Sequence, residues 1–131
     1  AKNILTKKRD VFRNYNFFLK NTDLQINKEI RNTRSSYWLI NIFLANKKIR
    51  DGLAKYLQKN KIETRNTFNL VHKMPMYFKK GQENLFPNAQ TLSNTGLSLP
   101  SGPNLSKLEI RKISSLIKNY VDKFNVKRTR P

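Results

Sequence analysis

The chain has 131 residues, which predicts one domain over residues 1–131 with a single hydrophobic core. It contains no cysteine, which excludes disulfides and thiolate metal sites, and its longest apolar run, YWLINIFLA, is too short to span a bilayer. Lysine and arginine outnumber aspartate and glutamate by 27 to 8, and the net charge of +19 predicts attraction to the phosphates of a nucleic acid, a sugar nucleotide or a membrane surface.

The charge has a second interpretation. Lysine, asparagine and isoleucine are abundant, a mixture that an AT-rich coding sequence produces on any solvated surface. The basic residues are spread along the chain, with short clusters such as Lys7–Arg9. No apolar leader is visible, and we expect a cytoplasmic protein without a membrane partner.

The first half of the sequence predicts a helix, a strand and a second helix. Apolar residues recur at helical spacing in residues 4–21, and basic residues fill the other face. Residues 35–44, SSYWLINIFL, carry mostly apolar residues on both faces, which is typical of a covered central strand. Asn46 is a favourable N-cap for a helix that continues to Lys59. One strand face comprises Trp38, Ile40, Ile42 and Leu44.

The second half predicts two strands and two helices. Residues 62–68 are expected to form a strand, followed by an irregular segment rich in proline and glycine. Residues 87–94 are expected to form a short helix before a strand at 97–100. The last helix starts at a Ser106–Glu109 capping box, and residues 125–131 are expected to be a flexible tail. This order favours a small α/β (α+β) domain in which helices cover a short sheet. The last helix should bury Ile110, Ile113, Ile117, Tyr120, Val121 and Phe124.

No catalytic signature is present. The sequence lacks a phosphate-binding G-x-x-x-x-G-K-[ST] loop, a G-x-G-x-x-G turn, an H-E-x-x-H zinc site and a G-x-S-x-G elbow. The eight carboxylates form no evident acid–base pair. We therefore identify no catalytic, cofactor-binding or metal-binding residue.

One cluster is a candidate substrate site: Arg65, His72, Lys73 and Tyr77, on a strand and the loop that leaves it. Taken singly, Arg65 is typical of a solvent-facing charge, His72 of a loop imidazole bonded to a carbonyl, and Tyr77 of a core aromatic. Together they suit an anionic ligand, because the cations can bind phosphate and an aromatic can contact a ring.

Three stretches carry a resemblance to a known family. SSYWLINIFL, IETRNTFNLVHKMPMY and FPNAQTLSNTGLSLPSGPNLSKLEI, in this order, resemble the C-terminal segment of the DegT/DnrJ/EryC1 aminotransferases, of the perosamine synthetase type. The resemblance implies the small C-terminal domain of a fold-type I enzyme that uses pyridoxal phosphate (PLP). Such enzymes are homodimers that aminate nucleotide-linked keto-sugars for cell-surface polysaccharides.

The resemblance also implies what this chain lacks. The family's Schiff-base lysine and most of its phosphate ligands lie in a large N-terminal domain, and no lysine here stands in the Schiff-base motif. We therefore expect a C-terminal fragment that binds no cofactor and is inactive alone. Its expected partners are a second copy, the large domain and the nucleotide-sugar substrate.

The same resemblance implies roles for the loop from His72 to Tyr77 at the mouth of the active site. His72 and Tyr77 would face the sugar or cofactor, and Lys73 and Arg65 would meet the diphosphate. Pro75 would fix the path of the loop, while the core would anchor it through Met74 and Phe78.

The resemblance also bears on the turn before the second strand, where the family favours glycine. This chain has Asn60 and Lys61 there. A left-handed lysine costs about 1 kcal/mol.

Two other functions stay open. The charge is compatible with a basic nucleic-acid-binding module, although the aromatics are expected on buried stripes rather than on an exposed stacking face. A domain separated from its catalytic partner could also have acquired an interaction role through an exposed apolar surface.

Overall fold

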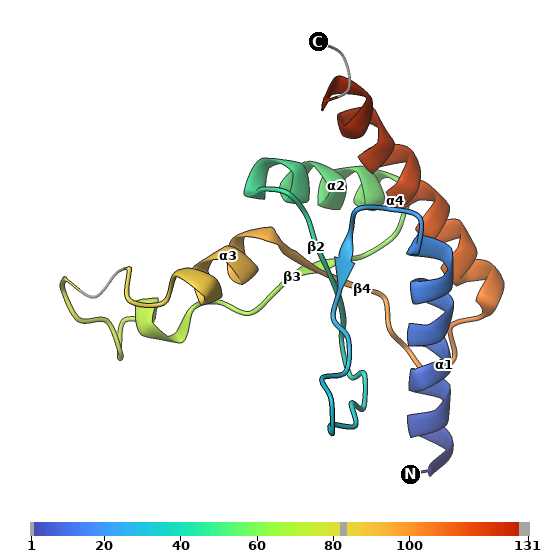
Figure 1. Ribbon diagram of the computed structural model, residues 1–131, viewed down its shortest axis with the longest axis horizontal. Coiled ribbons are helices and arrows are strands. Elements are labelled where there is room, and N and C mark those ends of the chain that lie inside the picture. Colours follow the sequence, from blue (N-terminus) through green and yellow to red (C-terminus); the bar gives the residue numbers. More distant parts are fainter. Residues whose placement is uncertain (1, 82–83, 129–131) are drawn as a thin grey trace.

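The computed structural model describes residues 2–81 and 84–128 (Figure 1). Its elements are α1 (Lys2–Leu19), β1 (Gln25–Ile26), β2 (Ile40–Phe43), α2 (Lys47–Lys59), β3 (Arg65–Asn66), the 3-10 helix η1 (Val71–Lys73), α3 (Pro87–Thr95), β4 (Gly96–Leu99) and α4 (Lys107–Arg128). This arrangement confirms the predicted small domain of helices around a short sheet. Within the described ranges, no helix is both long and apolar enough to cross a bilayer.

The sheet has the order β1-β2-β4-β3, and each neighbouring pair is antiparallel. Because β2 and β3 are both antiparallel to β4, they run in the same direction as each other. In the register, Ile40 lies opposite Leu99 and Asn41 opposite Ser98, while Arg65 lies on the other side of Ser98. Residues that lie opposite one another point to the same face of the sheet.

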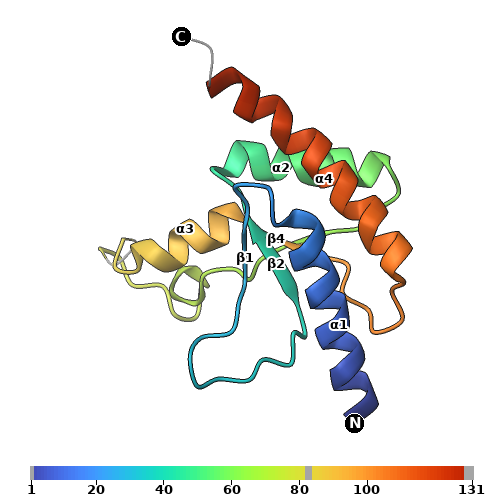
Figure 2. The same ribbon diagram turned by 45° about the vertical axis from the view of Figure 1, so that its right-hand side comes forward.

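One face of the sheet forms the core. Helices α1, α2 and α4 lie together on one side of the strands (Figures 1 and 2). The buried cluster comprises Ile40, Ile42, Leu44, Leu97 and Leu99 with Val11, Tyr15, Leu19, Leu53, Leu57, Ile62, Ile110, Ile113, Ile117 and Val121. The helices therefore leave the opposite face, which we call the outer face, available for a site.

The predicted helix starts are confirmed by their hydrogen bonds. The Asn46 side chain accepts from the backbone N–H of Ile49 at 2.9 Å. The Ser106 hydroxyl accepts from the N–H of Glu109 at 3.2 Å, and the Glu109 carboxylate accepts from the N–H of Ser106 at 2.8 Å. At the other end, α4 continues to Arg128, so part of the predicted tail is helical; residues 129–131 lie outside the described chain.

The prediction was wrong about Trp38. The strand begins at Ile40 rather than at residue 35, and the Trp38 side chain is 65% exposed. Tyr37 explains the difference, because its φ of +48° breaks the extended backbone on which the predicted alternation depends. The two-residue strand β1 was missed, and β3 is shorter than the predicted 62–68.

Candidate functional site

The outer face of the sheet has a polar centre. Asn41, Ser98 and Arg65 form one row across β2, β4 and β3, opposite the core. The Ser98 hydroxyl donates to Asn41 Oδ1 at 2.6 Å, and the backbone N–H of Asn41 donates to Asn27 Oδ1 at 2.6 Å. Ser98 is buried, and these bonds satisfy it and fix the floor of the face.

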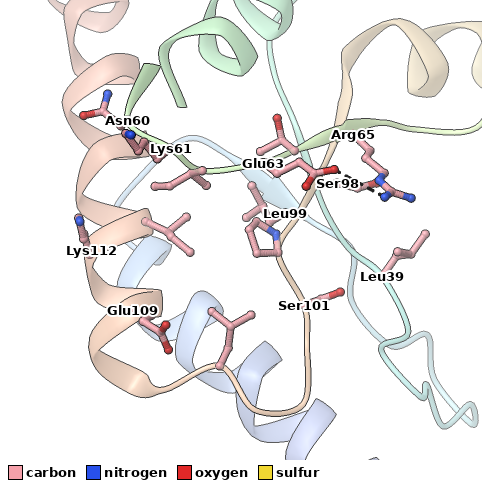
Figure 3. A pocket seen from close by; sticks show the side chains of 15 residues that line it. Leu39, Asn60, Lys61, Glu63, Arg65, Ser98, Leu99, Ser101, Glu109 and Lys112 are labelled. Atoms are coloured by element: carbon pink, nitrogen blue, oxygen red, sulfur yellow. Dashed lines mark ion pairs between the residues drawn. The ribbon is translucent and has the colours of Figure 1, made fainter. Parts of the chain in front are cut away.

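A first pocket of about 530 Å³ begins at this row and extends round the β3 edge to α4. Figure 3 shows Arg65 and Ser98 at one end of the pocket, and Lys112 and Glu109 on α4 at the other. Arg65 lies 3.6 Å from Glu63, and both side chains are more than four-fifths exposed. Such a pair contributes little, so the Arg65 guanidinium remains available to a ligand.

A second pocket, of about 620 Å³, lies between α3 and the loop that leaves β3. Its lining is largely apolar and includes Phe43, Phe68 and Phe86 together with His72 and Tyr77. The His72 ring lies 4.9 Å from the Phe86 ring, and its buried Nε2 has no hydrogen-bond partner among the residues that the structure describes. A buried polar nitrogen without a partner is costly, which is typical of a position that a ligand completes.

The walls of the second pocket are fixed by bonds to the C-terminal end of α3. The Thr67 hydroxyl donates to Leu92 O at 3.2 Å, and the Ser93 hydroxyl donates to Phe68 O at 3.2 Å. From α2, the buried Arg50 guanidinium donates to Gly96 O at 3.3 Å. These bonds hold the loop, α3 and the sheet in one arrangement.

The structure brings two of the four predicted site residues into one pocket. His72 and Tyr77 line the second pocket, Arg65 lines the first, and the exposed Lys73 lines neither of these two. The prediction that Phe78 anchors the loop in the core was wrong, because its side chain is 48% exposed. Met74 is half-buried.

Both pockets reach the outer face. Leu39 lines the first pocket and Phe43 the second, and they lie on the same side of β2 because side chains alternate along a strand. Arg65 lines the first pocket and Thr67 the second, and these two residues lie on the same side of the chain at β3 because they are two positions apart. Arg65 and the pocket of His72 and Tyr77 therefore both lie at the outer face.

Burial lowers the pKa of Lys8. Its ammonium donates to Ser101 O at 2.6 Å and to Trp38 O at 3.0 Å, which commits it to the fold. Lys8 is therefore not available to anchor PLP covalently. Over residues 2–81 and 84–128, no group of three or more histidine and acidic side chains could hold a metal ion.

Comparisons with known proteins agree with this architecture. Residues 1–118 match the DegT/DnrJ/EryC1/StrS aminotransferase family. A GDP-perosamine synthase of Vibrio cholerae is 37% identical over 119 residues, which cover 89% of this chain and 32% of that protein. A GDP-perosamine synthase of Escherichia coli O157:H7 is 34% identical over 120 residues, which cover 92% of this chain and 32% of that protein. The chain spans about a third of the length of these relatives.

Solved structures show the same fold. The aminotransferase TlmJ from Streptoalloteichus hindustanus has a TM-score of 0.81 at 19% identity, covering 92% of this chain and 32% of that one. A DegT DnrJ EryC1 StrS aminotransferase from Brucella abortus has a TM-score of 0.74 at 25% identity, covering 89% and 31%. By sequence match and by fold, this chain belongs to the DegT/DnrJ/EryC1/StrS aminotransferase family.

Proposed function

We propose that this chain is the substrate-facing C-terminal small domain of a PLP-dependent aminotransferase that acts on a nucleotide-linked keto-sugar for cell-surface polysaccharides. The observation that carries the proposal is the joint placement of His72 and Tyr77 in one pocket that reaches the outer face beside Arg65. The 37% identity to a GDP-perosamine synthase supports the same class of substrate.

Each residue type suits its proposed partner. The imidazole of His72 and the phenol of Tyr77 can hydrogen-bond sugar hydroxyls, while the apolar lining excludes water from the sugar ring. Arg65 can bind a diphosphate through two parallel N–H donors, and the exposed Lys73 adds a point charge nearby in sequence. The chain thereby orients the substrate and does not supply a reacting group.

Bound PLP supplies the electron sink for amino transfer, and its reactive lysine belongs to the large domain. The 131-residue chain alone should therefore neither anchor PLP covalently nor transaminate. Borohydride treatment of the chain with PLP, followed by mass spectrometry, measures this directly. Stoichiometric reduction onto one lysine would contradict the proposal.

The substrate role is testable in a hybrid enzyme. This chain replaces the matching third of the V. cholerae GDP-perosamine synthase, and amino transfer is measured for His72→Ala, Tyr77→Phe and Arg65→Ala. We expect kcat/KM to fall by about tenfold or more for each, because each removes a polar contact to the substrate. Lys59→Ala, at an exposed position on α2, is the matched control.

If the hybrid is inactive, the same three substitutions are made at the aligned positions of the full-length relative. Unchanged KM and kcat for all three would contradict the proposed roles.

The proposed partners are a second copy of the chain and a large domain that completes the site, in the cytoplasm. The exposed side chains of Phe68, Val71 and Tyr77 line the second pocket, and the exposed Met76 and Leu85 are next to lining residues in the sequence. Such a patch favours association. Sedimentation velocity should show a concentration-dependent dimer, and a monomer at all concentrations would contradict self-association.

A second candidate function is nucleic-acid binding. The sequence predicted that the aromatic residues are buried, which argued against this function. Phe17, Trp38 and Phe68 are instead exposed, and exposed aromatic rings can stack on bases. It predicts tight binding to DNA or RNA that weakens steeply with salt. Weak binding that is insensitive to salt would remove this candidate.

A further inference from the structure

We propose that Trp38 and Phe68 form a stacking site for the base of a nucleotide. This inference rests on the proposed function and extends it from the sugar to the other end of the substrate. The ligand class is a planar heteroaromatic ring linked to phosphate.

The two rings form an exposed aromatic pair. Trp38 is 65% exposed and Phe68 is 72% exposed, and their ring centroids lie 6.2 Å apart at 34°. Trp38 precedes β2 and Phe68 follows β3, so distant segments of the chain bring them together. Large aromatic surfaces in water are unfavourable, and a planar ligand that covers them gains stacking as well as burial.

The pair joins the start of one strand to the end of another. Because β2 and β3 run in the same direction, the start of β2 and the end of β3 lie at opposite ends of the strands. The two side chains nevertheless meet, as their ring contact shows. Positions 38 and 68 do not share the alternation of Arg65, so the pair is located by its own ring contact and by the second pocket, which Phe68 lines.

The backbone of each ring is fixed while the ring itself is exposed. Tyr37 has a φ of +48°, and its ring is buried against Phe12 at 3.8 Å and 11°. The carbonyl of Trp38 accepts from Lys8 Nζ at 3.0 Å and from the Ser101 hydroxyl at 3.1 Å. The carbonyl of Phe68 accepts from the Ser93 hydroxyl at 3.2 Å. Strained and anchored backbone around an exposed ring is typical of a preorganised contact site.

The surroundings favour a single nucleotide. Phe68 also lines the pocket of His72 and Tyr77, so a base on the pair would be next to a sugar in that pocket. Arg65 lies three residues before Phe68 in the sequence, and its ion pair with Glu63, at 3.6 Å, is exposed on both sides. Two aromatic rings with one available guanidinium match one base and its phosphates, whereas a nucleic acid strand needs stacking rings in succession.

The experiment uses the fact that Trp38 is the only tryptophan in the chain. We titrate the chain with GMP, and with ribose 5-phosphate as the ligand without a base, and follow tryptophan fluorescence excited at the red edge of its absorption. GMP should quench Trp38 saturably and ribose 5-phosphate should not. Phe68→Ala should weaken GMP binding by about tenfold. Phe17→Ala, which removes an exposed aromatic on α1, should leave it unchanged.

Three results would overturn the inference: no saturable quenching by GMP, equal responses to GMP and ribose 5-phosphate, or unchanged binding in Phe68→Ala. An oligonucleotide that binds far more tightly than GMP would also overturn it, in favour of nucleic acid. The proposed function is judged separately by the hybrid kinetics. Loss of GMP stacking with intact effects of His72→Ala would remove this inference alone, and the reverse pattern would remove the proposed roles alone.

Discussion

Single residues carry strain where the chain turns toward the outer face. Tyr37 and Lys61 have φ angles of +48° and +61°, a region that residues with a Cβ rarely adopt. At Lys61 the left-handed position follows the end of α2, where Asn60 caps the helix at a φ of −90°. The sequence suggested a left-handed residue at Asn60 or Lys61, and in the structure Lys61 is the left-handed one.

Lys61→Gly should therefore stabilise the protein. Glycine adopts this conformation without a Cβ clash, and the net gain is about 0.5–1 kcal/mol after its greater freedom in the unfolded chain is subtracted. Chemical denaturation measures the free energy of unfolding. Lys59→Gly, within α2, is the matched control and should lower it by a similar amount. Equal destabilisation by both changes would show that Lys61 bears no strain.

Arg50 joins α2 to the end of α3 and the start of β4. Its side chain is 4% exposed, its Nε donates to Asp51 at 2.7 Å, and its Nη1 donates to Gly96 O and to Ser93 O. Arg50→Met removes these charged donors, while the bonds from Thr67 to Gly96 O and Ser93 O at 3.4 Å remain. The free energy of unfolding should therefore fall by about 1.5–3 kcal/mol, the range for hydrogen bonds to a charged group. Thermal unfolding measures the change.

Lys47→Met is the control for Arg50→Met, because Lys47 bonds the same Asp51 carboxylate from an exposed position. It should cost less than about 1 kcal/mol. Similar losses in both variants would contradict the role of Arg50 as the link between these elements.

The stability of the N-terminal end of α4 should depend on pH through the Glu109 carboxylate. Hydrogen bonds from the Ser106 hydroxyl and backbone N–H hold the pKa of Glu109 below its ordinary value of 4.5. A carboxylate with a lowered folded pKa stabilises the fold above pH 4.5, and this contribution is lost as pH falls through the folded pKa. Wild type should therefore have a higher Tm than Glu109→Gln at pH 7, and the difference should shrink in acid.

Glu63→Gln is the control for the pH experiment, since Glu63 is exposed and its ion pair with Arg65, at 3.6 Å, is weak. A Tm difference for Glu109→Gln that is constant from pH 7 to acid would show that the carboxylate charge has no part in the cap. At pH 7, Ser106→Ala should itself cost about 1 kcal/mol.

For the whole molecule, periodicity predicted most of the architecture. Helices α1, α2 and α4 and the strands β2 and β4 follow from apolar spacing and from side-chain caps at Asn46 and Ser106. Two-residue strands such as β1 have too few positions for a pattern. Trp38 could not be placed from alternation, because the positive φ of Tyr37 depends on tertiary packing against Phe12.

The candidate site was predicted only in part. The loop after β3 brings His72 and Tyr77 to one pocket, and their part in substrate binding stays a prediction. The contribution of the outer face was not visible, because the pairing of Arg65 with Ser98 and the contact of Trp38 with Phe68 join segments far apart in sequence. Register and ring contacts of this kind require the tertiary structure.

The central claim is that the outer face and the pocket of His72 and Tyr77 bind a nucleotide-linked sugar. Amide chemical-shift mapping with a GDP-linked hexose tests it most directly. We expect saturable shifts at Trp38, Ser98 and residues 65–77, with α2 and α4 unaffected except where they border the first pocket. Shifts confined to the basic outer surfaces of α2 and α4, or none at saturating ligand, would contradict it.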